Sequence, residues 1–177
     1  MREEAADVIR ALKDSGFSKI VMMTGDSKRA AASIAQKVGV DEYYFEVLPE
    51  DKAKFVEREK AAGRNVIMIG DGINESPALS AADAGIAISD GAEIAKEIAV
   101  ITIGADNLYE LVLLKQISNR LMKRINSNYR KIVGINGGLI LLGVTGLIQP
   151  TISALFHNMS TLVISLNSMQ NLLDEPA

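Results

Sequence analysis

The 177-residue sequence contains no cysteine and no tryptophan, and it has a single histidine. The absence of cysteine excludes disulfide bonds and thiolate metal sites, which argues against a small secreted scaffold. The formal net charge is only -3, so no overall excess of positive charge predicts binding to nucleic acid. The opening segment MREEAADVIRALKDSG lacks the basic start and apolar core of a signal peptide. No secretion signal is expected there.

Charged residues are also absent from a long C-terminal stretch, since residues 132 to 172 contain no Asp, Glu, Lys or Arg. Two apolar segments lie here, at about 132–148 and 151–172. At about 1.5 Å per residue the first helix would reach roughly 25 Å, and the second is long enough to cross the hydrocarbon core. Basic residues precede the first segment, so we predict a transmembrane helical hairpin with both ends cytoplasmic. The alternative is a pair of core helices in a soluble protein.

The N-terminal part of the chain alternates short apolar runs with helical patterns, which is typical of a parallel sheet covered by helices. Buried strands are predicted at KIVMM, NVIMI, GIAIS and VITI, and helices at SKRAAASIAQKVG and PEDKAKFVEREKAAG. The sequence therefore predicts an α/β domain over residues 1–106, a basic connecting helix over 107–131 and the uncharged hairpin over 132–173.

Ligands bind at the carboxyl ends of parallel strands in open α/β sheets, and three predicted elements place polar groups there. Thr24 follows KIVMM, and Gly25 lets backbone N–H groups approach an anion. Lys52, at a helix start, is a point charge suited to a phosphoryl oxygen. The segment IGDGINE adds hard oxygen ligands suited to Mg²⁺: Asp71, Asn74 and Glu75. Each element alone is typical of a turn, cap or solvated surface, but the ordered set predicts a phosphoryl-transfer site.

The segments TGD, PEDK, GDGINESPAL and GIAI resemble, in this order, the second half of the phosphorylation domain of a P-type ATPase. That domain is part of the haloacid-dehalogenase-like superfamily. The uncharged hairpin, with LFHNMSTLVISLNSM, resembles the last two membrane helices of the heavy-metal-transporting branch. The resemblance covers essentially the whole chain. It implies a partial haloacid-dehalogenase-like, Rossmann-like parallel sheet followed by a transmembrane hairpin, in a multi-pass membrane protein whose soluble part is cytoplasmic.

The resemblance also implies roles for individual residues. Thr24, Lys52 and Asn74 would hold the phosphoryl group, and Asp71 would bind Mg²⁺. Glu75 stands where the family usually has Asp, and its longer arm would reach Mg²⁺ through water. The loop residues that would complete the cofactor site are Gly25, Asp26, Gly70 and Gly72. ATP would be bound mainly by regions outside this chain.

The family's nucleophile is an Asp in a D-K-T-G-T stretch, and the chain contains no such stretch. Because no phosphoenzyme forms without it, we predict that the chain alone does not hydrolyse ATP. In this superfamily the nucleophile strand lies between the strands that end at Thr24 and Asp71, so two buried strands would lack their central partner. We therefore expect a truncated or split gene product, or an internal start. The missing N-terminal part of the pump, or a complementing chain, would complete the site.

Polar residues within a membrane segment are costly and point to function. Asn136 and His157 occupy positions at which similar pumps place ion-binding residues, and Ser160 lies on the same helical face as His157. Imidazole suits Zn²⁺, Co²⁺, Ni²⁺ and copper ions, so these residues are predicted to hold a transported heavy-metal cation. The alternative is that Asn136 and His157 form hydrogen bonds that hold helices together.

The leading hypothesis is therefore part of an ATP-driven heavy-metal cation transporter in a lipid bilayer. A second hypothesis is a membrane-anchored, non-catalytic fragment that modulates or complements a full pump. A third is a soluble haloacid-dehalogenase-like phosphatase, against which the absent nucleophile and the apolar hairpin argue.

Overall fold

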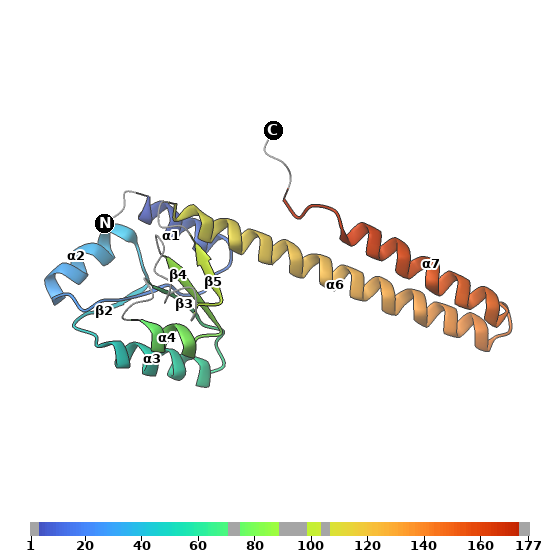
Figure 1. Cartoon of the computed structure of the whole chain (residues 1–177), viewed down its shortest axis with the longest axis horizontal. Helices are drawn as coiled ribbons and strands as arrows, with labels where there is room; N and C mark the ends of the chain where they lie inside the picture. Colours follow the sequence, from blue (N-terminus) through green and yellow to red (C-terminus); the bar gives the residue numbers. More distant parts are fainter. Residues whose placement is uncertain (1–3, 71–74, 89–98, 104–106, 174–177) are drawn as a thin grey trace. The chain divides into compact units, whose positions relative to one another are not determined.

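The computed structural model describes residues 4–70, 75–88, 99–103 and 107–173 (Figure 1). The chain divides into two compact units, Met1–Leu114 and Lys115–Ala177. The first unit contains all the described strands, and the second is helical.

Helices and strands alternate along the first unit, and this confirms the predicted α/β class. Its helices are α1 (Ala5–Asp14), α2 (Lys28–Val38), α3 (Pro49–Ala61) and α4 (Ser76–Ala81). Its strands are β1 (Val21–Met23), β2 (Glu42–Tyr44), β3 (Ile67–Gly70), β4 (Ala84–Ile88) and β5 (Ile101–Ile103). The boundaries follow local chemistry, since Pro49 occupies the first turn of α3 and Gly39 ends α2 with a φ of 77°.

All strand pairs are parallel, but the strands form two sheets. β1 pairs with β2, with Val21 opposite Glu42. The other sheet has the order β3-β4-β5, with Met68 opposite Gly85. Within the described residues no ladder joins β1 to β3, so each of these strands presents one unpaired edge. The sheet is therefore divided between the strands that end near Thr24 and Gly70.

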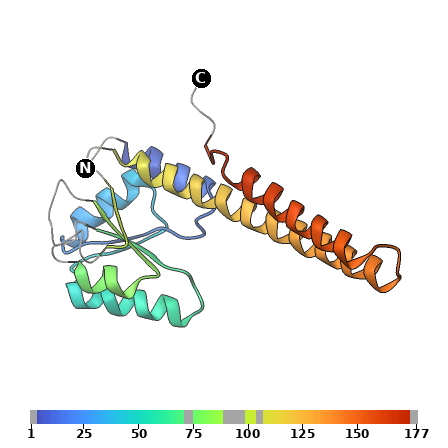
Figure 2. The same ribbon diagram turned by 45° about the vertical axis from the view of Figure 1, so that its right-hand side comes forward.

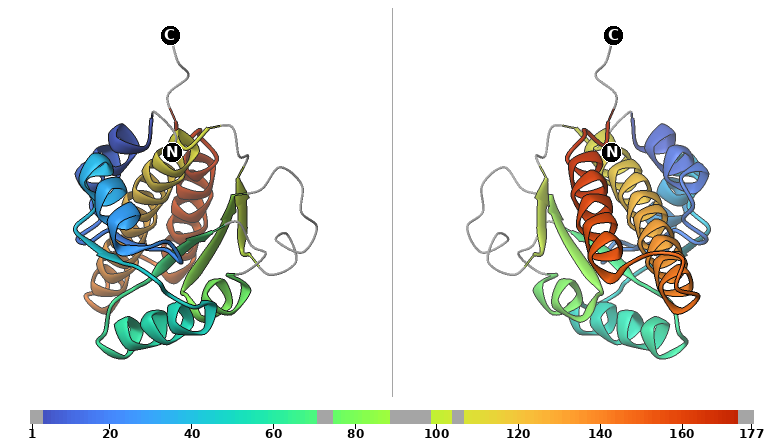
Figure 3. Two further views of the ribbon diagram at one scale, coloured as in Figure 1. Left: turned by 90° about the vertical axis from the view of Figure 1, so that its left-hand side faces the viewer. Right: turned by 90° about the vertical axis from the view of Figure 1, so that its right-hand side faces the viewer.

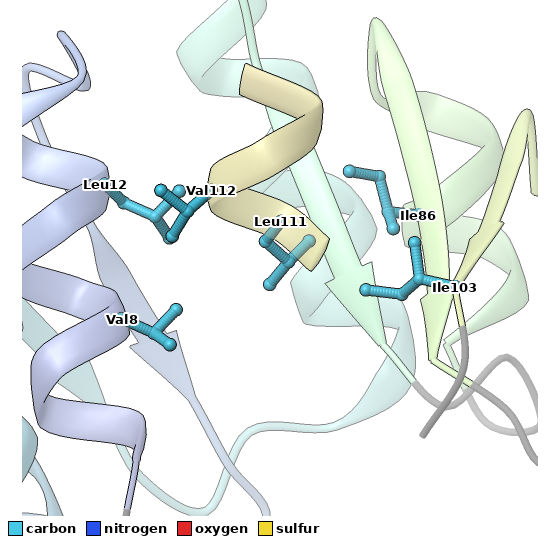
Figure 4. Close-up of a cluster of buried hydrophobic side chains, with 6 residues drawn as sticks. All are labelled: Val8, Leu12, Ile86, Ile103, Leu111 and Val112. Carbon is cyan, nitrogen blue, oxygen red and sulfur yellow. The ribbon is translucent and has the colours of Figure 1, made fainter. Parts of the chain in front are cut away.

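Helices cover both faces of the β3-β4-β5 sheet. On one face α3 and α4 lie side by side (Figure 2), and their buried side chains pack against the sheet through Val56, Met68, Ala78 and Leu79. On the other face α1 and the first turn of the helix that begins at Tyr109 pack against β4 and β5. Figure 4 shows this second cluster, whose members are Val8, Leu12, Ile86, Ile103, Leu111 and Val112. The result is a three-layer arrangement typical of parallel sheets.

The amino end of β1 is held by the carboxylate of Asp41. Asp41 Oδ2 accepts a hydrogen bond from the backbone N–H of Ile20 at 2.7 Å, and Oδ1 accepts one from Lys13 Nζ at 2.6 Å. Lys13 also donates to the carbonyl oxygen of Gly39 at 2.9 Å. One aspartate and one lysine thus join the end of α1, the end of α2 and the start of β1.

The same arrangement recurs at the amino end of β3. Asp83 accepts a hydrogen bond from the backbone N–H of Val66 at 2.8 Å and contacts Lys60 Nζ at 3.2 Å. Lys60 donates to the carbonyl oxygen of Ala81 at 2.7 Å. We call the contacts made by Asp41 and Asp83 the two aspartate latches. Each latch joins two helix ends to the start of a strand.

Both latches make stability depend on acid. Hydrogen bonds from Lys13 and then Ile20 hold the pKa of Asp41 below its ordinary value, and those from the Val66 N–H and then Lys60 do the same for Asp83. A carboxyl whose pKa is lowered by folding stabilises the fold above its unfolded pKa, and the stabilisation is lost as pH falls through its folded pKa. We expect the free energy of unfolding, measured by urea denaturation, to decrease as the pH falls below about 4.

The double variant Asp41→Asn, Asp83→Asn should show a smaller decrease over the same pH range than the unchanged chain. A matched control is the double variant Asp7→Asn, Asp14→Asn, which changes two carboxylates of α1 outside the latches. An unchanged acid dependence in the latch variant would contradict this account.

The second unit is a hairpin of two helices, which Figure 3 shows side by side. α6 (Tyr109–Val144) begins in the first unit and continues into the second, and α7 (Pro150–Ser168) returns along it. Gly146 allows the connecting turn, with a φ of 74°, and Pro150 occupies the first turn of α7. The basic segment and the first apolar segment of the sequence thus form one helix. The predicted domain boundaries at 106 and 131 stay predictions.

The C-terminal end of α7 is held by Arg124 of α6. Its Nη1 donates to the carbonyl oxygens of Ser168 at 3.0 Å and Gln170 at 2.5 Å, and its Nη2 donates to that of Asn171 at 3.0 Å. The last carbonyls of a helix have no partners within the helix, so a guanidinium with several donors satisfies them well.

One turn away on either side, α6 adds two more contacts to the same chain end. Arg120 Nη1 donates to the carbonyl oxygen of Leu172 at 2.8 Å, and Asn128 Nδ2 donates to Ser168 Oγ at 2.6 Å. These residues lie at intervals of four along the sequence, hence along one face of α6.

Replacing Arg124 with Gln should loosen the end of α7. Hydrogen bonds to a charged group contribute about 1.5–3 kcal/mol, so amide hydrogen exchange near Ser168 should become about 10-fold faster or more. The neighbouring exposed residue Lys123, changed to Gln, removes the same charge and serves as control. Equal exchange in the two variants would show that the guanidinium does not secure this chain end.

The predicted transmembrane hairpin is not supported at the level of its spans. Within the described ranges, no helix combines the length and the apolar character needed to cross a membrane. The helical hairpin itself is present, but polar residues interrupt its apolar runs, among them Asn136, His157 and Asn158.

Candidate functional site

Four segments that carry predicted site residues meet at one apolar cluster. Val56, Met68, Ala78 and Leu79 are buried there, and Met23 packs against them. Thr24 follows Met23, Lys52 lies one turn before Val56, Gly70 ends the strand that contains Met68, and Glu75 directly precedes α4. The fold thus brings together the backbone segments that the sequence analysis selected, at the carboxyl ends of β1 and β3.

Lys52 and Glu75 form an ion pair in which Lys52 Nζ contacts Glu75 Oε1. Their side chains are only 11% and 17% exposed, so the pair is largely shielded from water. A buried ammonium is unfavourable unless it is paired, and Glu75 supplies that partner. The sequence analysis named both residues as ligands of a phosphate or a metal, but it did not identify their contact with each other.

Gly70 makes room for this pair. A Cβ built on Gly70 would overlap the carboxylate of Glu75 and lie 2.8 Å from its Cδ. The Glu75 side chain therefore lies directly against the backbone at the end of β3. Gly25 differs, because a Cβ there would meet only the carbonyl oxygen of Val47 at 3.9 Å, an ordinary contact.

The loop after β1 is organised by Thr24 and Asp26. Thr24 Oγ1 donates to Asp26 Oδ2 at 2.8 Å and accepts a hydrogen bond from the Asp26 N–H at 3.1 Å. The Asp26 carbonyl in turn accepts from the N–H of Glu46 at 3.0 Å. Glu46 has a φ of 52°, a left-handed conformation that is uncommon for a residue other than glycine and often marks functional sites. No sequence signal pointed to it.

Asp71, Gly72 and Asn74 lie outside the described residues. Among the described ones, no three His, Asp or Glu side chains are grouped so that they could hold a metal ion. The carboxylate oxygens of Glu75 have the hard character that Mg²⁺ prefers, and one of them is engaged by Lys52. The described side chains thus fit a Mg²⁺ site in chemistry, with Glu75 as a donor.

The second predicted site is on the hairpin. His157 Nδ1 lies 2.8 Å from Asn136 Oδ1, so the ring donates its Nδ1 proton to the amide oxygen and keeps Nε2 as an acceptor. Ser160 Oγ donates to the carbonyl oxygen of His157 at 2.8 Å, which leaves lone pairs on the hydroxyl. Asn136 and His157 also line an open, mostly apolar groove of about 660 Å³ between α6 and α7. The predicted pair is therefore in contact.

Residues 1–83 match the family described as haloacid dehalogenase-like hydrolase. The Haemophilus influenzae deoxy-D-mannose-octulosonate 8-phosphate phosphatase supports the same fold, with 17% identity, a TM-score of 0.54 and coverage of 66% of this chain and 72% of that one. The first unit is thus a haloacid-dehalogenase-like α/β domain, as the resemblance predicted.

Similarity to heavy-metal pumps extends over nearly the whole chain. The zinc-exporting P-type ATPase of Mycobacterium marinum is 38% identical over 169 residues, which is 95% of this chain and 23% of that protein. The manganese-exporting P-type ATPase of Mycobacterium leprae is also 38% identical, over 95% of this chain and 23% of its own length. A crystal structure of a zinc-transporting PIB-type ATPase in its E2.Pi state matches with a TM-score of 0.88 and 32% identity. It covers 98% of this chain and 28% of that one.

The chain is therefore homologous to heavy-metal P-type ATPases, and it spans about a quarter of the length of these relatives. This confirms the predicted similarity to part of a pump.

Proposed function

We propose that the chain supplies one half of the phosphorylation site of a heavy-metal P-type ATPase, together with the last helical hairpin of the pump. The observation that carries this proposal is the divided sheet. β1 and β3 each have an unpaired edge, and Met23 of β1 packs against the same cluster as Met68 of β3. This is the place at which the superfamily inserts the strand with its nucleophilic Asp. A strand from the missing part of the pump, or from a complementing chain, would pair with both edges.

Within that completed site, each residue has a distinct role. Lys52 would hold a phosphoryl oxygen by charge, and the hydroxyl of Thr24 would donate to another oxygen after releasing Asp26. Asn74 would steady the same phosphate. Asp71 and Glu75 would hold Mg²⁺, which neutralises negative charge on phosphate when bound. ATP would bind mainly to regions outside this chain.

We assign residues 1–106 to the phosphorylation domain, 107–131 to a connecting helix and 132–173 to a membrane hairpin of a multi-pass protein whose soluble part is cytoplasmic. Large apolar side chains exposed on the hairpin support the membrane assignment, among them Ile140 at 67%, Val144 at 81% and Leu147 at 72%. A surface of this kind is typically covered by protein or lipid. The polar residues would be tolerated where they face other helices of the pump.

Asn136, His157 and Ser160 would lie on the route of the transported cation. Replacing His157 with Ala in a restored full-length pump should abolish metal-stimulated ATP turnover, because imidazole Nε2 would be lost as a ligand. The matched control is Asn167→Ala, a polar residue of the same helix outside the proposed route. Turnover that keeps its metal dependence in the His157 variant would reduce this residue to a packing role.

The decisive experiment for the proposed function is complementation. The chain is mixed with the separately produced N-terminal part of a related pump, which carries the D-K-T-G-T strand, and acid-stable labelling by γ-³²P-ATP is measured. Labelling only in the mixture is expected. Absence of labelling in the mixture would oppose complementation, while labelling of the chain alone would contradict the assigned site. Hydrolysis of p-nitrophenyl phosphate by the chain alone would favour the soluble phosphatase instead.

A further inference from the structure

We infer that the carboxylate of Glu75 occupies, in the phosphate-free chain, the place beside Lys52 that a phosphate oxygen takes on binding. This inference deepens the proposed function and rests on it. Glu75 is then a placeholder anion that holds Lys52 in position, and it must yield when phosphate enters.

The burial of Lys52 is the first argument. Within the described part of the chain, Lys52 is the charged side chain that is classed as buried, with 9% of the residue exposed. An ammonium in such a place needs a permanent counter-ion, because removing it from water is unfavourable. Glu75 meets that need in direct contact with Lys52 Nζ. Any phosphate that uses Lys52 must therefore share or replace an existing anion.

The seat of Glu75 on Gly70 is the second argument. A Cβ on Gly70 would lie 3.2 Å from Glu75 Cβ and 2.8 Å from its Cδ, so the whole side chain is folded back along the end of β3. The carboxylate consequently points from the start of α4 to the start of α3, where Lys52 lies. An Asp at this position is one methylene shorter, and its carboxylate would be drawn back from Lys52.

The charges decide the consequence. Lys Nζ has three donors and accepts either a carboxylate or a phosphate as its partner, but two anions held against one ammonium repel each other. Phosphate without a metal ion should therefore bind weakly while Glu75 remains ionised beside Lys52. Removing the charge of Glu75 should open the site to the anion.

The test measures thermal unfolding of the full chain in EDTA, with inorganic phosphate or with sodium chloride of equal ionic strength. Phosphate should raise the unfolding temperature of Glu75→Gln by about 3 °C or more above its effect on the unchanged chain. The double variant Lys52→Met, Glu75→Gln should lose this extra effect. The matched control is Glu59→Gln, since Glu59 also pairs with a cation, Arg64, and its side chain is 14% exposed.

Equal phosphate effects in the unchanged chain and in Glu75→Gln would overturn the inference, as would an extra effect that survives the loss of Lys52. If Glu75→Gln does not fold, Glu75→Asp provides the same comparison with the charge kept and the carboxylate drawn back. The complementation experiment uses unchanged Glu75, so the two proposals fail separately. Labelling without phosphate rescue removes only the placeholder, and rescue without labelling removes only the pump assignment.

Discussion

Replacing Gly85 with Ala should lower the free energy of unfolding of the first unit by about 2–3 kcal/mol. Gly85 lies in β4, the central strand of its sheet, and a Cβ there would lie 2.7 Å from the carbonyl oxygen of Leu79. That oxygen belongs to the backbone at α4, and the Leu79 side chain is only 2% exposed, so neither can move aside easily. Urea denaturation followed by circular dichroism would measure the change.

Gly137→Ala is the matched control for this prediction. A Cβ on Gly137 meets no atom within 4 Å, and the residue lies inside α6. Alanine is favoured over glycine within a helix by about 1 kcal/mol, so this variant should be unchanged or slightly more stable. A Gly85 variant as stable as the unchanged chain would mean that α4 can shift away from β4.

Replacing Lys52 with Met should have two large effects. Loss of one partner from a shielded ion pair leaves Glu75 unpaired and should destabilise the first unit by about 3 kcal/mol. In the complemented mixture, labelling by γ-³²P-ATP should slow by about 100-fold or more, because a charge that stabilises the transferred group is lost. Stopped time courses of labelling and urea denaturation measure the two effects separately.

Lys54→Met provides the comparison for Lys52. It removes a lysine from the same helix, but the Lys54 side chain is 70% exposed and its contact with Asp51 is 3.4 Å long. Exposed pairs of this kind contribute at most about 1 kcal/mol, so stability and labelling should be nearly unchanged. If both variants labelled at the same rate, Lys52 would have no special role toward phosphate.

Much of the first unit could be predicted from local patterns. The apolar runs KIVMM, NVIMI and VITI correspond to β1, β3 and β5, and the proline and glycine signals placed α2 and α3. β2 (Glu42–Tyr44) carries no apolar run and is exposed throughout, so its pairing with β1 had no signal in the sequence. An edge strand is stabilised by its partner's backbone more than by burial of its own side chains.

The candidate site was predictable as a set of residues but not as a set of contacts. Lys52 and Glu75 each fitted a chemical role, yet their ion pair depends on side-chain reach across 23 positions of sequence. The aspartate latches escaped prediction for the same reason, because Asp41 is followed by an ordinary strand and nothing marks its partner Ile20. The membrane spans were inferred from the absence of charge, and that criterion gave too little weight to uncharged polar residues such as Asn136 and His157.

The aspartate latches have a consequence for how this domain tolerates change. Asp41 and Asp83 secure the starts of β1 and β3, whereas Thr24, Gly70 and Glu75 lie at the opposite ends of the same strands. Reactive and load-carrying positions are thus separated by the length of a strand. Substitutions that retune the chemistry at one rim should leave the anchoring at the other intact, which makes the domain a favourable scaffold for altering specificity without loss of folding.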